Sequence, residues 1–95
     1  MPRKESDGQT PKRRIRFSLE APGAQEVGLA GTFNGWEARA RLLKRDGRGV
    51  WSTSLTLTPG TYEYRFLVDG AWQNDPGAGV SPNPYGTQNS VRVVI

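Results

Sequence analysis

The feature that most limits the fold is a two-residue alternation of apolar and polar side chains, repeated in short runs. The clearest run spans residues 61–68, where Tyr62, Tyr64, Phe66 and Val68 alternate with intervening residues that are mostly polar or charged. This period places alternate side chains on opposite faces of a β-strand. Similar runs predict further strands over 12–20, 26–31, 50–57 and 89–95, and in the last of these we expect Val91, Val93 and Ile95 to face inward.

Turn residues separate these runs. The segments 46–49 (DGRG), 58–60 (TPG) and 69–70 (DG) contain the Asp, Pro and Gly residues that tight turns require. Residues 37–44 favour a helix by propensity but span only two turns, so we expect a loop that leads into a short strand over 42–45. Residues 74–88 are rich in Pro, Gly, Asn and Ser, which predicts a long ordered loop. The pattern as a whole indicates an all-β fold, an antiparallel β-sandwich of about seven strands.

Composition excludes several classes of protein. The 95 residues contain neither Cys nor His, so disulfides, thiolate metal sites and a histidine general base are excluded. No apolar run approaches the roughly 18 residues that a membrane-spanning helix needs. The basic N-terminal region has no apolar segment behind it, which argues against a secretory signal. We therefore expect a cytoplasmic protein with no metal and no cofactor.

The net charge of +4 can be assigned to the N-terminal sixteen residues, which contain six basic and two acidic side chains. On this interpretation the remaining residues are electrically neutral. We predict a disordered basic tail over 1–11 and one folded domain over 12–95. Nucleic-acid binding through this tail is the least favoured function, because such tails more often keep a protein in solution.

Two of the three tryptophans are not explained by strand alternation. Trp36 ends the turn sequence Phe33-Asn34-Gly35-Trp36, and Trp72 follows the turn at 69–70. Trp51 shares a strand face with leucines and is assigned to the core. An exposed indole offers a rigid apolar plane with one N–H donor, which suits the apolar C–H face of a pyranose ring. The pattern alone leaves open whether Trp36 and Trp72 bind sugar or cover the ends of the sandwich.

Polar candidates accompany these rings. Arg65 lies on the strand face opposite Tyr64 and Phe66, where it could donate to sugar hydroxyls or simply pair with Glu63. The segment Tyr85 to Asn89 places a ring, a hydroxyl and two amides at the end of the long loop. Ordinary turn chemistry is the alternative explanation for that segment.

Four sequence blocks together resemble a known family. They are VGLAGTFNGW at 27–36, GTYEYRFLVDGAW at 60–72, Asp75-Pro76, and GTQNS at 86–90. In this order they resemble carbohydrate-binding module family 48, and most closely the glycogen-binding domain of the AMP-activated protein kinase β subunit. Similar domains precede the barrel of branching enzymes and isoamylases. The resemblance covers about residues 14–95 and implies an early-set, immunoglobulin-like sandwich.

The same resemblance implies a site. Trp36 and Trp72 would stack on glucose rings, while Arg65, Thr87 and Asn89 would donate or accept hydrogen bonds with the hydroxyls. Tyr85 stands where the kinase domain has a leucine that reaches into the curve of the glucan. Arg65 replaces the family's lysine, and Glu37 adds an acid beside Trp36.

We therefore expect non-catalytic binding of α-1,4-linked glucan (glycogen, starch or malto-oligosaccharides), by a module that acts alone or targets an enzyme or kinase partner. Glycoside hydrolysis needs two carboxylates across a cleft. The sequence offers only Glu37 near the predicted site, without an evident second acid. The alternative is a protein–protein interaction module on the same fold that has lost sugar binding.

Overall fold

The computed structural model describes residues 11–95, and strands dominate this range. The elements are β2 (Arg13–Glu20), β3 (Val27–Gly31), the 3₁₀ turn η1 (Ala38–Ala40), β4 (Lys44–Arg45), β5 (Val50–Leu57), β6 (Gly60–Val68), β7 (Ala71–Gln73), β8 (Gly79–Pro82) and β9 (Gln88–Val94). The predicted disordered tail lies outside the described residues except for Pro11. No helix of the described range is long and apolar enough to cross a membrane.

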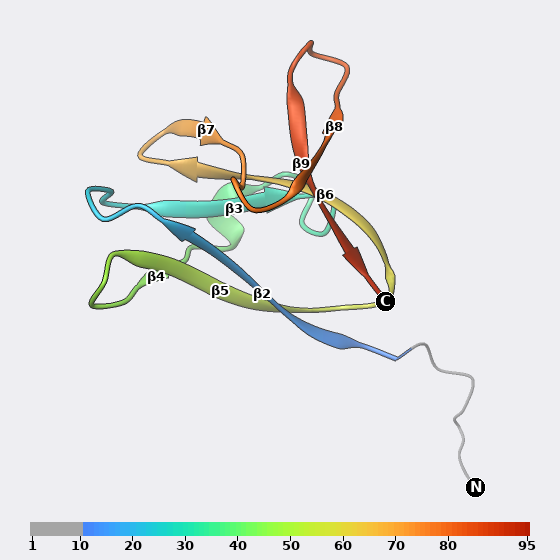
Figure 1. Ribbon diagram of the computed structural model, residues 1–95, viewed down its shortest axis with the longest axis horizontal. Coiled ribbons are helices and arrows are strands. Elements are labelled where there is room, and N and C mark those ends of the chain that lie inside the picture. The colour runs from blue at the N-terminus through green and yellow to red at the C-terminus, as the bar shows by residue number, and fades with distance from the viewer. Residues whose placement is uncertain (1–10) are drawn as a thin grey trace, which may run out of the picture.

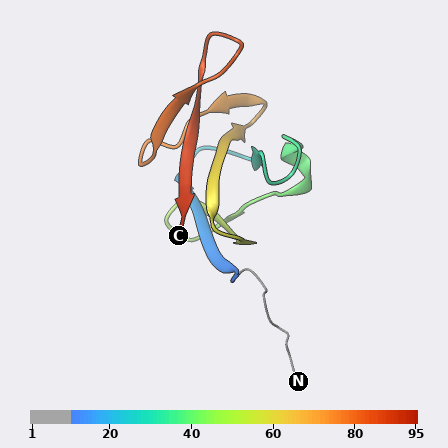
Figure 2. The same ribbon diagram turned by 90° about the vertical axis from the view of Figure 1, so that its right-hand side faces the viewer.

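Two antiparallel sheets form the layers of a sandwich (Figure 1). The first sheet has the order β2-β5-β4, and the second has the order β3-β6-β9-β8, with β7 paired to β6. Figure 2 shows β9 (red) beside β6 (yellow), with the end of β9 next to the start of β6. The predicted all-β antiparallel sandwich is confirmed.

Aromatic residues from both sheets fill the core. Phe17 of β2 contacts Tyr64 of β6 edge to face, with ring centroids 4.9 Å apart, and Tyr64 contacts Phe66 in the same manner at 5.9 Å. Such pairs add about 0.5–1.5 kcal/mol beyond the burial of area. Trp51 is buried as predicted, and its Nε1 donates to the Ala21 carbonyl at 2.9 Å. The core therefore contains the alternating residues that the sequence pattern assigned to it on β2, β5 and β6.

The prediction for the last strand was wrong in its facing. Ser90 and Val94 are buried, whereas Val93 and Ile95 are exposed. The register explains the difference, because Ser90 lies opposite the inward-facing Tyr64 and the facing alternates from there. The inward position between Ser90 and Val94 belongs to Arg92, whose guanidinium lies 4.8 Å from the centre of the Phe17 ring and donates to the Arg16 carbonyl.

Two other predictions need correction. The segment 74–88 is not entirely loop, because β8 pairs with β9 as the edge strand of the second sheet. Pro82 ends β8, at an edge where a strand tolerates proline. The loop predicted at 37–41 contains η1, and the short strand that follows is limited to Lys44–Arg45.

The positive charge belongs to the fold and not to the tail. β2 begins at Arg13 and therefore includes three of the six basic residues that the sequence interpretation assigned to the N-terminal sixteen residues. Residues 11–95 contain eleven Lys or Arg and seven Asp or Glu, which accounts for the whole net charge of +4. The described domain is therefore basic, in contrast to the predicted neutral domain.

Candidate functional site

A break in strand pairing creates the candidate site on the outer face of the second sheet. β9 pairs with β6 from Gly60 to Tyr64, and β7 pairs with β6 from Phe66 to Val68. β3 occupies the opposite edge of β6 over this second stretch, so β7 and β9 lie on the same edge. Arg65 lies between these two pairings, at the point where the edge of β6 is open.

Trp36 is held in place by a tightly hydrogen-bonded turn. The Asn34 side chain accepts from the Gly31 N–H at 3.0 Å and donates to the Leu29 carbonyl at 2.9 Å. The Trp36 N–H donates to the Gly31 carbonyl at 3.0 Å. Trp36 itself has φ of 64°, a left-handed conformation that costs a non-glycine residue about 1–2 kcal/mol. Strain of this kind persists only where the surrounding bonds enforce it, and here the strained turn carries an indole that lines the hollow described below.

Tyr85 is presented by a loop that Asn83 organises. The Asn83 Oδ1 accepts from the backbone N–H groups of Tyr85 at 3.0 Å and Thr87 at 3.1 Å. Its Nδ2 donates to Thr87 Oγ1 at 2.7 Å and to Asn89 Oδ1 at 3.0 Å. Tyr85 is nevertheless 87% exposed, so a fixed backbone carries a ring that packs against little of the protein.

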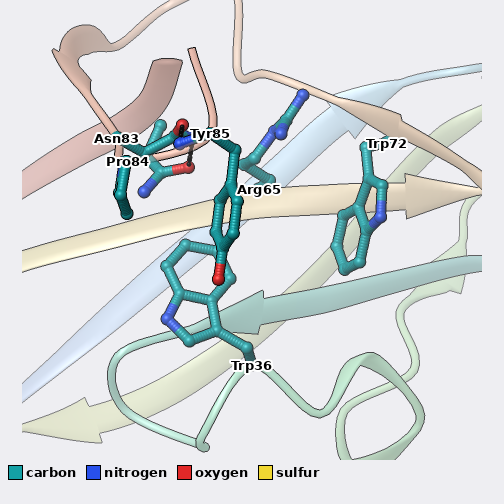
Figure 3. Close-up of a pocket in the computed structure, with 7 residues that line it drawn as sticks. Trp36, Arg65, Trp72, Asn83, Pro84 and Tyr85 are labelled. Carbon is teal, nitrogen blue, oxygen red and sulfur yellow. Dashed lines mark hydrogen bonds between the residues drawn. The ribbon is translucent and has the colours of Figure 1, made fainter. Parts of the chain in front are cut away.

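These segments surround one hollow of about 470 Å³. Figure 3 shows Trp36, Tyr85 and Trp72 around it, with the Tyr85 ring between the two indoles in this view. The lining consists of Trp36, Arg65, Trp72, Asn83, Pro84, Tyr85 and Asn89. The structure thus brings together five of the six residues that the sequence analysis selected.

Thr87 is the selected residue that does not line the hollow. Its hydroxyl donates to Asn83 Oδ1 at 3.0 Å, so it contributes to the loop. Asn83 and Pro84 are lining residues that the sequence analysis missed. An Asn-Pro pair directly before an aromatic residue is a turn signal, and this signal could have identified the loop as a rigid support.

The polar groups at the site differ in how far they are satisfied. Asn89 is buried, and its Nδ2 donates to Glu63 Oε1 at 3.0 Å. Glu63 is therefore bonded to Asn89, and the alternative pairing with Arg65 does not form in the structure. The Arg65 guanidinium lies 6.0 Å from the centre of the Trp72 ring, and its buried Nε has no hydrogen-bond partner. A guanidinium beside exposed rings places N–H donors next to apolar planes, so the hollow can bind a ligand that has both apolar faces and hydrogen-bond acceptors.

A second hydrogen-bond network fixes the base of the long loop. The Tyr64 hydroxyl donates to Asp75 Oδ2 at 2.6 Å, and the Asp75 N–H donates to the buried Ser90 hydroxyl oxygen at 2.8 Å. Burial, together with this bond to Asp75, raises the pKa of Tyr64 above its ordinary value. The loop between β7 and β9 is thus anchored to the core beneath the hollow. In the described residues, no cluster of acidic side chains could hold a metal ion.

The fold and this site define a class: β-sandwich domains that bind carbohydrate on an aromatic surface. Residues 14–95 match the family described as the glycogen recognition site of AMP-activated protein kinase, and the chain belongs to that family. The predicted resemblance is confirmed.

Individual relatives agree with this assignment. The chain is 36% identical over 77 residues to the human 5'-AMP-activated protein kinase subunit beta-2, covering 81% of this chain and 26% of that protein. It is 51% identical over 53 residues to the chloroplastic FLOURY ENDOSPERM 6 of Oryza sativa, covering 56% of this chain and 10% of that protein. It is 31% identical over 83 residues to a 1,4-alpha-glucan branching enzyme of Clostridium perfringens, covering 85% of this chain and 12% of that protein. The chain thus spans about a quarter of the kinase subunit and about a tenth of the other two proteins.

Proposed function

We propose that this chain binds α-1,4-linked glucan in the hollow formed by Trp36, Tyr85 and Trp72. The observation that carries the proposal is the group of three exposed rings that line one hollow together with Arg65. Each ring offers an apolar plane to the C–H face of a glucose unit. The Arg65 guanidinium supplies N–H donors for the hydroxyls between these faces, and Asn89 contributes the second N–H of its Nδ2, because its Oδ1 and one N–H are already bonded to Asn83 and Glu63.

Thr87 takes a supporting role in this proposal. Because its hydroxyl is bonded to Asn83, it holds the Tyr85 loop in place instead of contacting sugar. Tyr85 is larger and more rigid than the leucine of the kinase domain. We therefore expect it to select the curvature or length of the glucan chain.

The binding is proposed to be non-catalytic. Glu63 is bonded to Asn89, Asp69 accepts from the Gln25 and Glu26 N–H groups, and Asp75 accepts from Tyr64. The fold therefore accounts for these acids. Glu37, beside Trp36, has no second carboxylate placed across the hollow from it, as hydrolysis would require. The module would target a partner enzyme or kinase to glucan, and the relatives named above include a kinase subunit and a glucan branching enzyme. The cytoplasmic setting stays a prediction, because the name of the rice relative contains the word chloroplastic.

The test is calorimetric titration with β-cyclodextrin and with maltoheptaose. We expect saturable binding, with a loss of at least about tenfold in Trp36→Ala and in Trp72→Ala, since each removes one stacking plane. Val93→Ala is the matched control, because it shortens an exposed apolar side chain outside the hollow. Absence of wild-type binding at millimolar glucan, or equal affinity in all variants, would refute the proposal.

A further inference from the structure

The backbone edge of β5 is open over half of its length. β4 pairs only with Trp51 and Ser52, whereas β5 continues to Leu57. Figure 1 shows the short β4 beside one end of the much longer β5. Within residues 11–95, no strand pairs with the stretch from Thr53 to Leu57 on this side.

The hydrogen-bonding direction of this open stretch follows from its neighbours. The Val50 carbonyl accepts from the Asp46 N–H at 2.9 Å, so Val50 directs its backbone groups toward the β4 side. Alternate residues of an antiparallel strand direct their N–H and C=O groups to the same side. Ser54 and Thr56 therefore present theirs beyond the end of β4.

A second hollow, of about 560 Å³, follows this edge. It is lined by the consecutive residues from Ser54 to Leu57 and, across from them, by Phe33, Ala40 and Arg41. Consecutive strand residues belong to both faces of a sheet, so a hollow that touches all of them lies along the edge. Phe33 and Leu55 are partly buried and give the hollow an apolar floor.

The surroundings of the hollow are positively charged. Exposed Arg41 lines it, and no acidic residue does. On the adjoining outer face of the sheet, Arg14 and Arg16 lie opposite Thr56 and Ser54 in the β2–β5 register. Residues 12–57 contain nine basic and four acidic side chains, whereas residues 58–95 contain two and three. The positive charge is therefore concentrated in the half of the chain that contains the open edge.

This distribution distinguishes between possible occupants. Lysine and arginine at a strand edge discourage pairing with another copy of the same chain, because the two edges repel each other. The same charges attract an extended segment that carries Asp or Glu. The phosphates of a nucleic acid would pair with the basic side chains but would not contact the open backbone groups or the apolar floor of the hollow.

We propose that the open edge of β5 binds an acidic, extended segment of a partner polypeptide. The segment adds a strand beside Ser54 and Thr56, in line with the place where β4 stops. Its backbone pairs with these two residues, its apolar side chains face Phe33 and Leu55, and its carboxylates lie near Arg41, Arg14 and Arg16. No residue lines both this hollow and the proposed glucan site, and the inference does not depend on glucan binding.

The experiment selects peptides from a displayed library of random twelve-residue sequences on the immobilised protein. We expect enrichment of Asp or Glu alternating with apolar residues. Synthetic peptides of these sequences should slow amide hydrogen exchange of Ser54 and Thr56 at least tenfold, as measured by NMR. Slower exchange at these two amides reports strand pairing, which charge attraction alone does not produce.

Variants locate the binding. Thr56→Pro removes an N–H that faces the hollow and leaves the β2–β5 pairing groups in place, and Arg41→Glu reverses the lining charge. Each should weaken peptide binding at least tenfold, while Arg48→Glu, the same charge change at an exposed turn outside the hollow, should not. If Thr56→Pro fails to fold by circular dichroism, Arg41→Glu and the exchange data decide.

Three results would overturn the proposal. The first is a selection without enrichment of acidic residues. The second is peptide binding that leaves the exchange of Ser54 and Thr56 unchanged. The third is tight binding of a DNA duplex that displaces the selected peptides and does not protect these amides, which would assign the surface to nucleic acid.

Discussion

At the scale of single residues, the proposed glucan site contains a backbone conformation that lowers the stability of the folded chain. Trp36 adopts φ of 64°, which only glycine adopts without cost. Trp36→Gly and Trp36→Ala should both lose glucan binding. Trp36→Gly should nevertheless be the more stable of the two by about 1 kcal/mol, because glycine relieves the left-handed strain that alanine retains. Urea unfolding of the two variants measures this difference, and equal stability would mean that the turn relaxes when the indole is removed.

Asn83 is a residue that acts at the site through others. Asn83→Ala removes the bonds that hold Tyr85 and Thr87, so affinity for β-cyclodextrin should fall about tenfold while stability changes by about 1 kcal/mol. Asn83→Asp keeps the acceptor oxygen for both backbone N–H groups and should retain most of the affinity. Calorimetry compares the two variants, and an equal loss in both would show that the acceptor bonds do not position the loop.

At the scale of elements, the bond between Tyr64 and Asp75 ties β6 to the loop beneath the site. Tyr64→Phe should lower the free energy of unfolding by about 1.5–3 kcal/mol at neutral pH, because a partly buried carboxylate loses its donor.

The raised pKa of Tyr64 also predicts that the folded chain becomes less stable at alkaline pH. In the unfolded chain the phenol deprotonates near pH 10, while in the folded chain it keeps its proton, so the free energy of unfolding falls as the pH rises above about 10. Denaturant titrations between pH 8 and 11 should show this fall in the wild type and a smaller one in Tyr64→Phe.

How well each element could be predicted depended on how strongly its side chains report burial. In β6 the inward residues are large and aromatic, so the period of two predicted the facing correctly. In β9 the inward positions are Ser90, Arg92 and Val94, and two of these are polar because they satisfy the Asp75 network and cover the Phe17 ring. Valines on the outer face therefore suggested the opposite facing. Pairing with β6 decided the register, and a local pattern does not contain that information.

The residues of the candidate site also divide into those that the sequence could identify and those that it could not. Trp36 and Trp72 could be selected because they broke the strand pattern, and the resemblance supplied Arg65, Thr87 and Asn89. The Asn83-Pro84 pair signals a turn, but the role of Asn83 depends on bonds to residues four and six positions later, which only the folded loop brings within reach. The open edge of β5 could not be predicted from the sequence either, because it results from β4 ending after two residues.

At the scale of the whole molecule, the two surfaces use different physical forces, and salt should separate them. The glucan is uncharged, and the proposed contacts are ring planes and hydrogen bonds, so maltoheptaose affinity should change less than about twofold between 0.05 and 0.5 M NaCl. The acidic peptide at β5 meets exposed arginines, so its affinity should fall about tenfold or more over the same range.

Calorimetric titrations of each ligand in the presence of the other test whether the two surfaces bind their ligands independently. The turn from Phe33 to Trp36 contributes to both surfaces, with Phe33 and Asn34 lining one hollow and Trp36 the other. If peptide binding shifts this turn, the affinity for maltoheptaose will change when the β5 edge is occupied, and by linkage the affinity for peptide will change by the same factor.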